Sequence, residues 1–169
     1  MAYLKTNEKY AEFNSEIAKR ENNDCMVRAL ATAAEVDYDT AHKFAKDVFQ
    51  REDRKGTMNG MITAAFLKAE EAGMQVGKKM LAVTVLGKCH TKNRYKLYGE
   101  IVWRQKTLKS FIETHQKGTY MVMVAGHALT VKDGELMDWG KMAYKPTRKV
   151  QAAYQVEVQR NEPVQLSLF

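Results

Sequence analysis

The dipeptide Asp133-Gly134 constrains this chain most strongly, because it separates two strand-like segments by only two residues. Asp-Gly favours the backbone of a tight two-residue turn and is one of the strongest short-range signals of a β-hairpin. Residues 127–132 are therefore expected to pair antiparallel with residues 135–139. The preceding residues 119–125 form a continuous apolar run, which is typical of a central strand.

The first part of the chain has the spacing of helices instead. Residues 24–34 are apolar over much of a helical circumference, with Asp24 as the expected N-cap. A second, amphipathic helix is predicted over residues 41–49 with Asp39 as its cap, and a third is expected to end at Gly73. Helices first and an antiparallel sheet afterwards predict the α+β class, with N-terminal helices packed on a C-terminal sheet.

Shorter segments complete the expected fold. Strands are predicted over residues 81–86, 101–103 and 150–158, and a short helix over residues 107–115. Between the first two of these strands we expect a basic loop. A chain of 169 residues that is 45% hydrophobic suits one domain, which we place at residues 1–160. Residues 161–169 leave the strand pattern and are expected to form a flexible tail.

The net charge of +7 is concentrated between Lys78 and Lys109, where nine basic residues face one acid, Glu100. Such a segment can face nucleic acid or an acidic protein, or it can be a solvated surface. Its aromatic residues, which include Tyr95 and Trp103, are more typical of strands than of a recognised base-stacking motif.

Other classes of protein are disfavoured by the composition. The first ten residues have no apolar segment of a signal peptide, and no apolar run approaches the ~20 residues of a membrane span. Two cysteines, Cys25 and Cys89, are too few for a disulfide framework and lack paired metal-ligand spacing. We therefore expect a cytoplasmic protein with no metal and no cofactor.

Three residues far apart in the sequence form a candidate catalytic group. Cys25 lies at the expected N-terminus of a helix, where positive potential favours the thiolate. The turn at 133–134 places His127 and Asp138 diagonally on one face of neighbouring strands, so that the carboxylate can reach the imidazole. An acid that orients a histidine beside a nucleophile is the arrangement of acyl-transfer enzymes. The alternative is a buried structural cysteine and a core histidine.

These segments resemble the papain-like cysteine peptidases, in the broad sense that includes the bacterial peptidases that trim double-glycine leader peptides. The resemblance rests on Asn23-Asp24-Cys25 opening a buried helix, His127 at a strand start, and Asp138-Trp139-Gly140. It implies a papain-like fold in which Cys25 attacks a carbonyl, His127 acts as base and then acid, and Asp138 orients His127. Arylamine acetyltransferases and transglutaminases share this residue order, but their chains are usually longer.

The sequence departs from the papain-like pattern at one position. Those families usually carry an oxyanion-hole glutamine about six residues before the cysteine, and this chain has Lys19 there. The resemblance then leaves Asn22 or Asn23, together with the backbone N–H of Cys25, to polarise the substrate carbonyl.

The last five residues, Gln165, Leu166, Ser167, Leu168 and Phe169, resemble the sliding-clamp-binding pentapeptide of bacterial DNA polymerases and mismatch-repair proteins. This resemblance implies that Leu168 and Phe169 enter an apolar pocket of the clamp while the amide of Gln165 makes directed hydrogen bonds. A frayed apolar end that folds back on the core is the alternative.

Together, the two resemblances predict a small cysteine peptidase, similar to small phage proteins, that is docked on the bacterial sliding clamp and acts on a protein or peptide. An inactive papain-like module could instead occupy the clamp groove and interfere with host replication factors. In either case residues 78–109 would lie near DNA. A basic nucleic-acid-binding protein is the third hypothesis.

Overall fold

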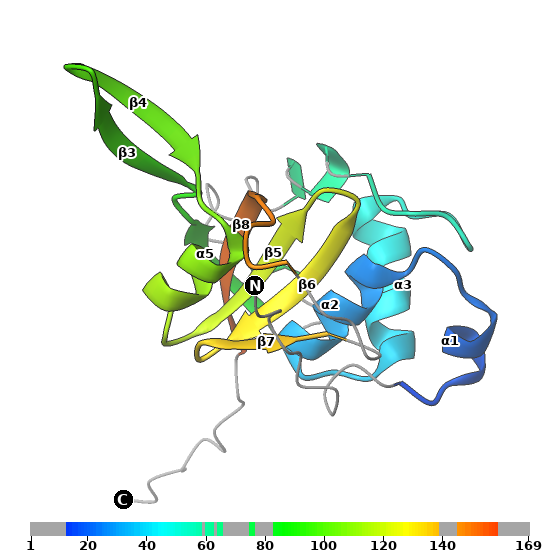
Figure 1. The fold of residues 1–169 in the computed structure, drawn as a ribbon. Coiled ribbons are helices and arrows are strands. Elements are labelled where there is room, and N and C mark those ends of the chain that lie inside the picture. Colours follow the sequence, from blue (N-terminus) through cyan, green and yellow to red (C-terminus); the bar gives the residue numbers. More distant parts are fainter. Residues whose placement is uncertain are drawn as a thin grey trace, which may run out of the picture.

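The computed structural model describes residues 13–58, 60–62, 64–65, 75–76, 83–138 and 145–158 (Figure 1). Its helices include α1 (Glu16–Arg20), α2 (Cys25–Ala34), α3 (Tyr38–Phe49) and α5 (Leu108–Thr114). The strands are β1 (Gln75–Val76), β2 (Val83–Lys88), β3 (Lys92–Leu97), β4 (Glu100–Gln105), β5 (Thr119–Val124), β6 (His127–Lys132), β7 (Glu135–Met137) and β8 (Val150–Val158). Residues 60–62 and 64–65 are also helical, whereas the expected end of that helix at Gly73 lies outside the described residues.

Six of these strands form one antiparallel sheet in the order β1-β2-β8-β5-β6-β7. The predicted hairpin is present: β6 and β7 are joined at Asp133 and Gly134, which have φ values of 48° and 77°. Its register places Lys132 opposite Glu135, as a two-residue turn requires. Helices and an antiparallel sheet in this order confirm the α+β class.

Helices cover both faces of the six-stranded sheet, with α2 and α3 on one side and α5 on the other (Figure 1). Alternate residues of β5 enter two separate cores. Met121 and Met123 pack into the core beneath α2 and α3, whereas Tyr120, Val122 and Val124 pack into the core beneath α5. A strand that is covered on both faces needs apolar residues at every position. This accounts for the continuous apolar run that identified β5 in the sequence.

Asp24 occupies the predicted N-cap position of α2 without making the expected capping bond, and Asp39, the predicted cap of the next helix, lies inside the first turn of α3. Asp24 precedes α2, but its side chain makes no capping bond and instead accepts from Nε of Arg28 (3.0 Å) and from the hydroxyl of Tyr38 (2.7 Å). Helix α3 begins at Tyr38, earlier than expected, and Asp37 caps it by accepting from the backbone N–H of Thr40. The hydroxyl of Tyr38 and the side chain of Arg28 take the place of the backbone N–H groups as partners of Asp24.

The expected basic loop was also wrong. Its residues 92–97 form β3, which pairs with β4 through a turn at Tyr98-Gly99, where φ is 49° and 87°. The turn and the pairing of Tyr95 with Val102 favour strands, although lysine, arginine and asparagine dominate β3. This hairpin is a separate two-stranded sheet that extends away from the body of the molecule (Figure 1).

Candidate active site

Helix α2 and strand β6 position two of the three residues that the sequence singled out. Cys25 is the first residue of α2, and His127 is the first residue of β6. The buried hydroxyl of Thr130 in β6 donates to the carbonyl oxygen of Ala29 in α2 at 2.8 Å. This bond holds the two elements side by side, so that the beginning of the helix lies next to the beginning of the strand.

Asp138 follows the last residue of β7 and faces the ring of His127. Its Oδ2 lies 2.6 Å from Nε2 of His127, and the two side chains are only 3% and 12% exposed. Burial alone would lower the pKa of His127, but its hydrogen bonds with Asp138 and with Cys25 outweigh burial and raise the pKa to about 9. The imidazole is therefore protonated at neutral pH.

The thiol of Cys25 is the second partner of His127. Burial would raise the pKa of Cys25, but the hydrogen bond with His127 and those from the backbone N–H groups of Ala128 and Met26 together lower it. The other cysteine, Cys89, has no such partner side chain, and burial raises its pKa to about 11. The structure thus brings Cys25, His127 and Asp138 into one contact chain, in which the thiol of Cys25 ionises more readily than an ordinary cysteine.

Cys25 and His127 lie at the surface of a pocket of about 520 Å³. Cys25 and His127 line one part of the pocket, and residues 56–58 and Ile62 line another. No described residue makes a hydrogen bond with the buried hydroxyl of Thr57, and Met58 is 70% exposed. A substrate in the pocket therefore meets the apolar, exposed Met58 as well as the thiol. Sequence reasoning missed this wall, because a polar loop carries no local signal of the site that it faces.

The two predicted oxyanion residues differ in position. Asn23 lines the pocket with Cys25, and its amide nitrogen lies 3.5 Å from the carbonyl oxygen of Arg54. Asn22 is exposed and does not line the pocket, and its carbonyl oxygen accepts from Arg51 at 3.2 Å. Lys19, which stands in the family's glutamine position, is exposed on α1 and pairs with an acid of the same helix. Of these side chains, only that of Asn23 is near the thiol.

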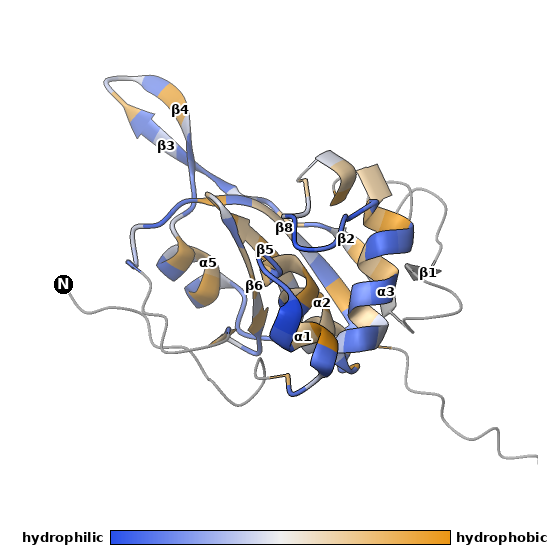
Figure 2. Cartoon of the chain, turned by 90° about the vertical axis from the view of Figure 1, so that its right-hand side faces the viewer, coloured by the Kyte–Doolittle hydropathy of each residue, from blue (hydrophilic) through white to orange (hydrophobic). Residues whose placement is uncertain are grey.

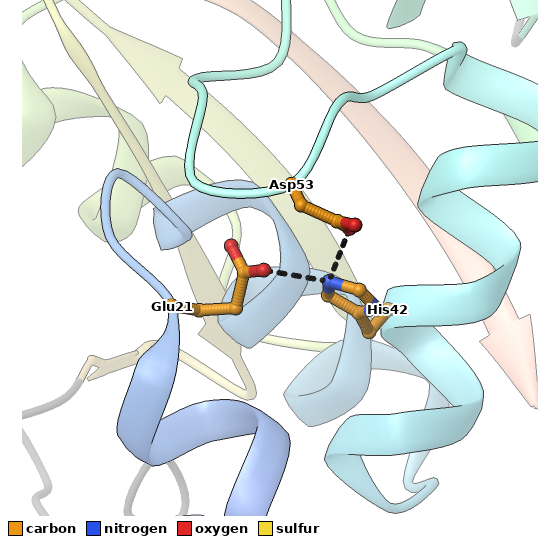
Figure 3. A group of neighbouring side chains, drawn as sticks. All are labelled: Glu21, His42 and Asp53. Atoms are coloured by element: carbon orange, nitrogen blue, oxygen red, sulfur yellow. Dashed lines mark hydrogen bonds and ion pairs between the residues drawn. The ribbon is translucent and has the colours of Figure 1, made fainter.

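A second group of polar side chains joins Glu21, which lies four residues before Cys25, to His42 and Asp53, which follow it in the chain (Figure 3). One ligand atom each of Glu21, His42 and Asp53 lies within 4.8 Å of the others, which is close enough to share a metal ion. Nη2 of Arg51 already binds Glu21 at 2.6 Å, and Nζ of Lys46 binds Asp53 at 2.9 Å. These two cations already balance the carboxylates, so the geometry is that of a closed ion-pair network.

His42 lies on α3, but it is buried rather than solvated. His42 is 6% exposed, and its Nε2 lies 3.2 Å from Oε1 of Glu21 and 3.6 Å from Oδ1 of Asp53. Glu21 also accepts from the backbone N–H of Arg54 at 2.8 Å. The network therefore ties the loop after α3 to the turn that leads into Cys25, and that loop continues into the pocket wall at residues 56–58.

Comparisons of the chain with protein-family models, with curated proteins and with solved structures gave no match. Among the described residues, none of the helices combines the length and the apolar character that a bilayer span requires. Residues 165–169 and the predicted aromatic neighbour of the acid, Trp139, lie outside the part of the chain that the structure describes.

Proposed function

We propose that this chain is a papain-like cysteine peptidase, a thiol hydrolase with Cys25 as nucleophile, His127 as general base and acid, and Asp138 as the residue that orients His127. The single observation that carries the proposal is the contact chain from Cys25 through His127 to Asp138 at the edge of a pocket. A central helix that begins at the nucleophile and packs on an antiparallel sheet also agrees with the layout of that family.

The first half of the reaction transfers an acyl group to sulfur. The thiolate of Cys25 attacks the carbonyl carbon of a peptide bond, and the carbonyl π electrons move onto the oxygen. The side chain of Asn23 and the N-terminus of α2 are the groups that can stabilise this oxyanion. His127 then gives its proton to the nitrogen of the leaving amine as the carbon–nitrogen bond breaks. A thioester of Cys25 and a free amine are the products of this step.

The second half returns the enzyme to its starting state. Water attacks the thioester carbon while the now neutral His127 accepts its proton. The carbon–sulfur bond breaks, the thiolate of Cys25 re-forms beside the protonated imidazole, and a carboxylic acid leaves. Since Nε2 of His127 is bound to Asp138, Nδ1 is the nitrogen that serves the thiol and the water. Asp138 keeps the ring in this orientation throughout.

A fluorogenic peptide library at pH 7 tests this proposal. We expect the full chain to cleave a subset of the peptides, Cys25→Ala and His127→Ala to be inactive, and Asp138→Asn to be slower by about 100-fold or more. Cys89→Ala is the matched control and should keep full activity. Cleavage that survives in Cys25→Ala would refute the proposal. If no peptide is cleaved but Cys25→Ala captures a protein from a bacterial lysate, that protein becomes the substrate to test.

We further propose that the enzyme acts in a bacterial cytoplasm, docked on the DNA sliding clamp through Gln165, Leu166, Ser167, Leu168 and Phe169. The support for this proposal is the agreement of all five residues with the clamp-binding pentapeptide. A purified bacterial clamp should retain the full chain, but not a variant that lacks residues 165–169. The truncated variant should melt at the same temperature as the full chain, and retained binding would contradict the proposal.

The inactive module that only occupies the clamp groove gives a different result in the same two assays. It would bind the clamp through the tail, and it would show no cleavage of any peptide. Preferential alkylation of Cys25 would still be possible in that case, because the contact with His127 lowers the pKa of the thiol without requiring turnover. Cleavage that depends on Cys25 therefore decides for the enzyme.

A further inference from the structure

The β3–β4 hairpin carries a charged and aromatic surface that the proposed peptidase does not use. The two strands pair only with each other among the described strands, and the hairpin extends away from the body of the molecule (Figure 1). Hydrophilic and hydrophobic residues lie next to one another along it (Figure 2). An isolated ribbon of two strands is marginally stable in water. Contact with a partner molecule would therefore stabilise this exposed hairpin.

The register of the hairpin sorts its side chains onto two faces. Residues directly opposite in an antiparallel pair share a face, and alternate residues along a strand share it too. Arg94 lies opposite Trp103, and Lys96 lies opposite Ile101. One face therefore carries a row of cations on β3, with Lys92 at its base, next to an apolar row on β4. Trp103 is 54% exposed and Ile101 is 52% exposed. We call this face the hairpin surface.

The cations of the hairpin surface differ from other exposed lysines of the protein. Lys19, Lys43 and Lys55 each pair with an acidic side chain within 3.2 Å. Among the described residues, no acid forms such a pair with any of the three cations of the hairpin surface. Within the described part of the chain no ion pair neutralises their positive charge, so it is available to an anionic partner.

We propose that the hairpin surface binds the phosphate backbone of nucleic acid. Alternate residues of a strand are about 6.8 Å apart, so the three cations form an extended row that can follow the phosphates of one nucleic-acid strand. A two-stranded ribbon also fits the major groove of DNA. Trp103 on the same face, and Tyr98 fully exposed at the tip, are flat side chains on which an unpaired base can stack. Duplex and single strand offer the same phosphate chemistry, and the two are distinguished by experiment.

The test measures binding of the full chain to a labelled 20-base-pair duplex and a 20-nucleotide single strand by fluorescence anisotropy. Salt is varied from 50 to 200 mM. The variant Lys92→Gln/Arg94→Gln/Lys96→Gln removes the three cations, and Lys19→Gln/Lys43→Gln/Lys55→Gln removes the same charge from the helical side as the matched control. All six side chains are exposed, so both variants should have the same melting temperature as the wild type.

The loss of three phosphate contacts should change the salt dependence of the affinity by a defined amount. The slope of log affinity against log salt should become shallower by about 2.7 for a duplex or about 2.1 for a single strand. The change of about 2.7 corresponds to about a 40-fold effect between 50 and 200 mM salt. The nucleic acid that the wild type binds more tightly is the preferred ligand. The control variant should leave the slope nearly unchanged. Trp103→Ala should weaken single-strand binding at least about fivefold, and unchanged binding would contradict the stacking role.

Three outcomes would overturn the proposal. The first is no binding to either nucleic acid at 50 mM salt. The second is an equal loss in the hairpin variant and the control variant, which would mean that only the total charge matters. The third is tighter binding to polyglutamate than to nucleic acid, which would assign the hairpin surface to an acidic protein. None of these outcomes bears on the peptidase, because the hairpin variant leaves Cys25 and His127 intact.

Discussion

Selective alkylation of Cys25 is the most direct test of the candidate site, because it needs no substrate. The pKa of Cys25 lies below its ordinary value of 9.0, and the pKa of Cys89 is raised to about 11. At pH 7, more than about 1% of Cys25 is therefore thiolate, against about 0.01% of Cys89. The thiolate populations differ by a factor of at least about 100.

The expected difference in rate is smaller than the difference in population. A thiolate of lower pKa is intrinsically less nucleophilic, by about half a logarithmic unit for each unit of pKa. Over two units of pKa this offsets about tenfold of the advantage. Cys25 should therefore react with iodoacetamide at least about ten times faster than Cys89 at pH 7. Mass spectrometry of the digested protein measures both rates in the same sample.

The variant His127→Ala measures how much the imidazole contributes to the alkylation rate of Cys25. In His127→Ala, the burial that raises the pKa of Cys25 remains while its strongest hydrogen-bond partner is lost. The rate at Cys25 should then fall towards that of Cys89. His115→Ala is a matched control, because His115 stacks on Phe111 away from Cys25. Equal and slow labelling of both cysteines in the wild type, or no effect of His127→Ala, would refute the reasoning.

Three further results are expected from stability measurements. The raised pKa of His127 stabilises the fold fully below pH 6.5, and this contribution is lost as the pH rises to about 9; over this range the melting temperature of the wild type should therefore fall more than that of Asp138→Asn. Tyr38→Phe removes a buried hydrogen bond to Asp24 and should cost about 1–3 kcal/mol in urea unfolding, so a neutral change would contradict a structural role for that bond. Thr130→Val removes the bond between β6 and α2 and should cost about 1 kcal/mol, measured in the same way, and an unchanged midpoint would exclude that contribution.

Sequence patterns predicted those parts of the fold whose causes are local. The turn at Asp133-Gly134 set the register of β6 and β7, and the register in turn predicted that Asp138 would reach His127. The spacing of apolar residues identified α2, α5 and β5 within a few residues of their observed ends. In each case the signal and the structure that it forms lie within the same ten to fifteen residues.

The features that were missed depend on contacts between distant segments. Arg51 reaches Glu21 across 30 positions, and this contact, with His42, closes the network before Cys25. Strand β3 lacked the alternation of a half-buried strand because both of its faces meet solvent over most of their length. Its polar residues therefore resembled a loop. Neither result could be obtained from periodicity, which reports burial against a core and nothing else.

The failed cap at Asp24 clarifies how the candidate site is built. A carboxylate that capped α2 would place negative charge beside the thiol and would bind the first N–H groups of the helix. Both effects would oppose a thiolate. The side chain of Asp24 instead turns to Arg28 and Tyr38, and the N–H of Met26 donates to Cys25. The same acid therefore anchors the start of the helix while its charge is neutralised by Arg28, and the N-terminus of α2 remains available to sulfur and to a developing oxyanion.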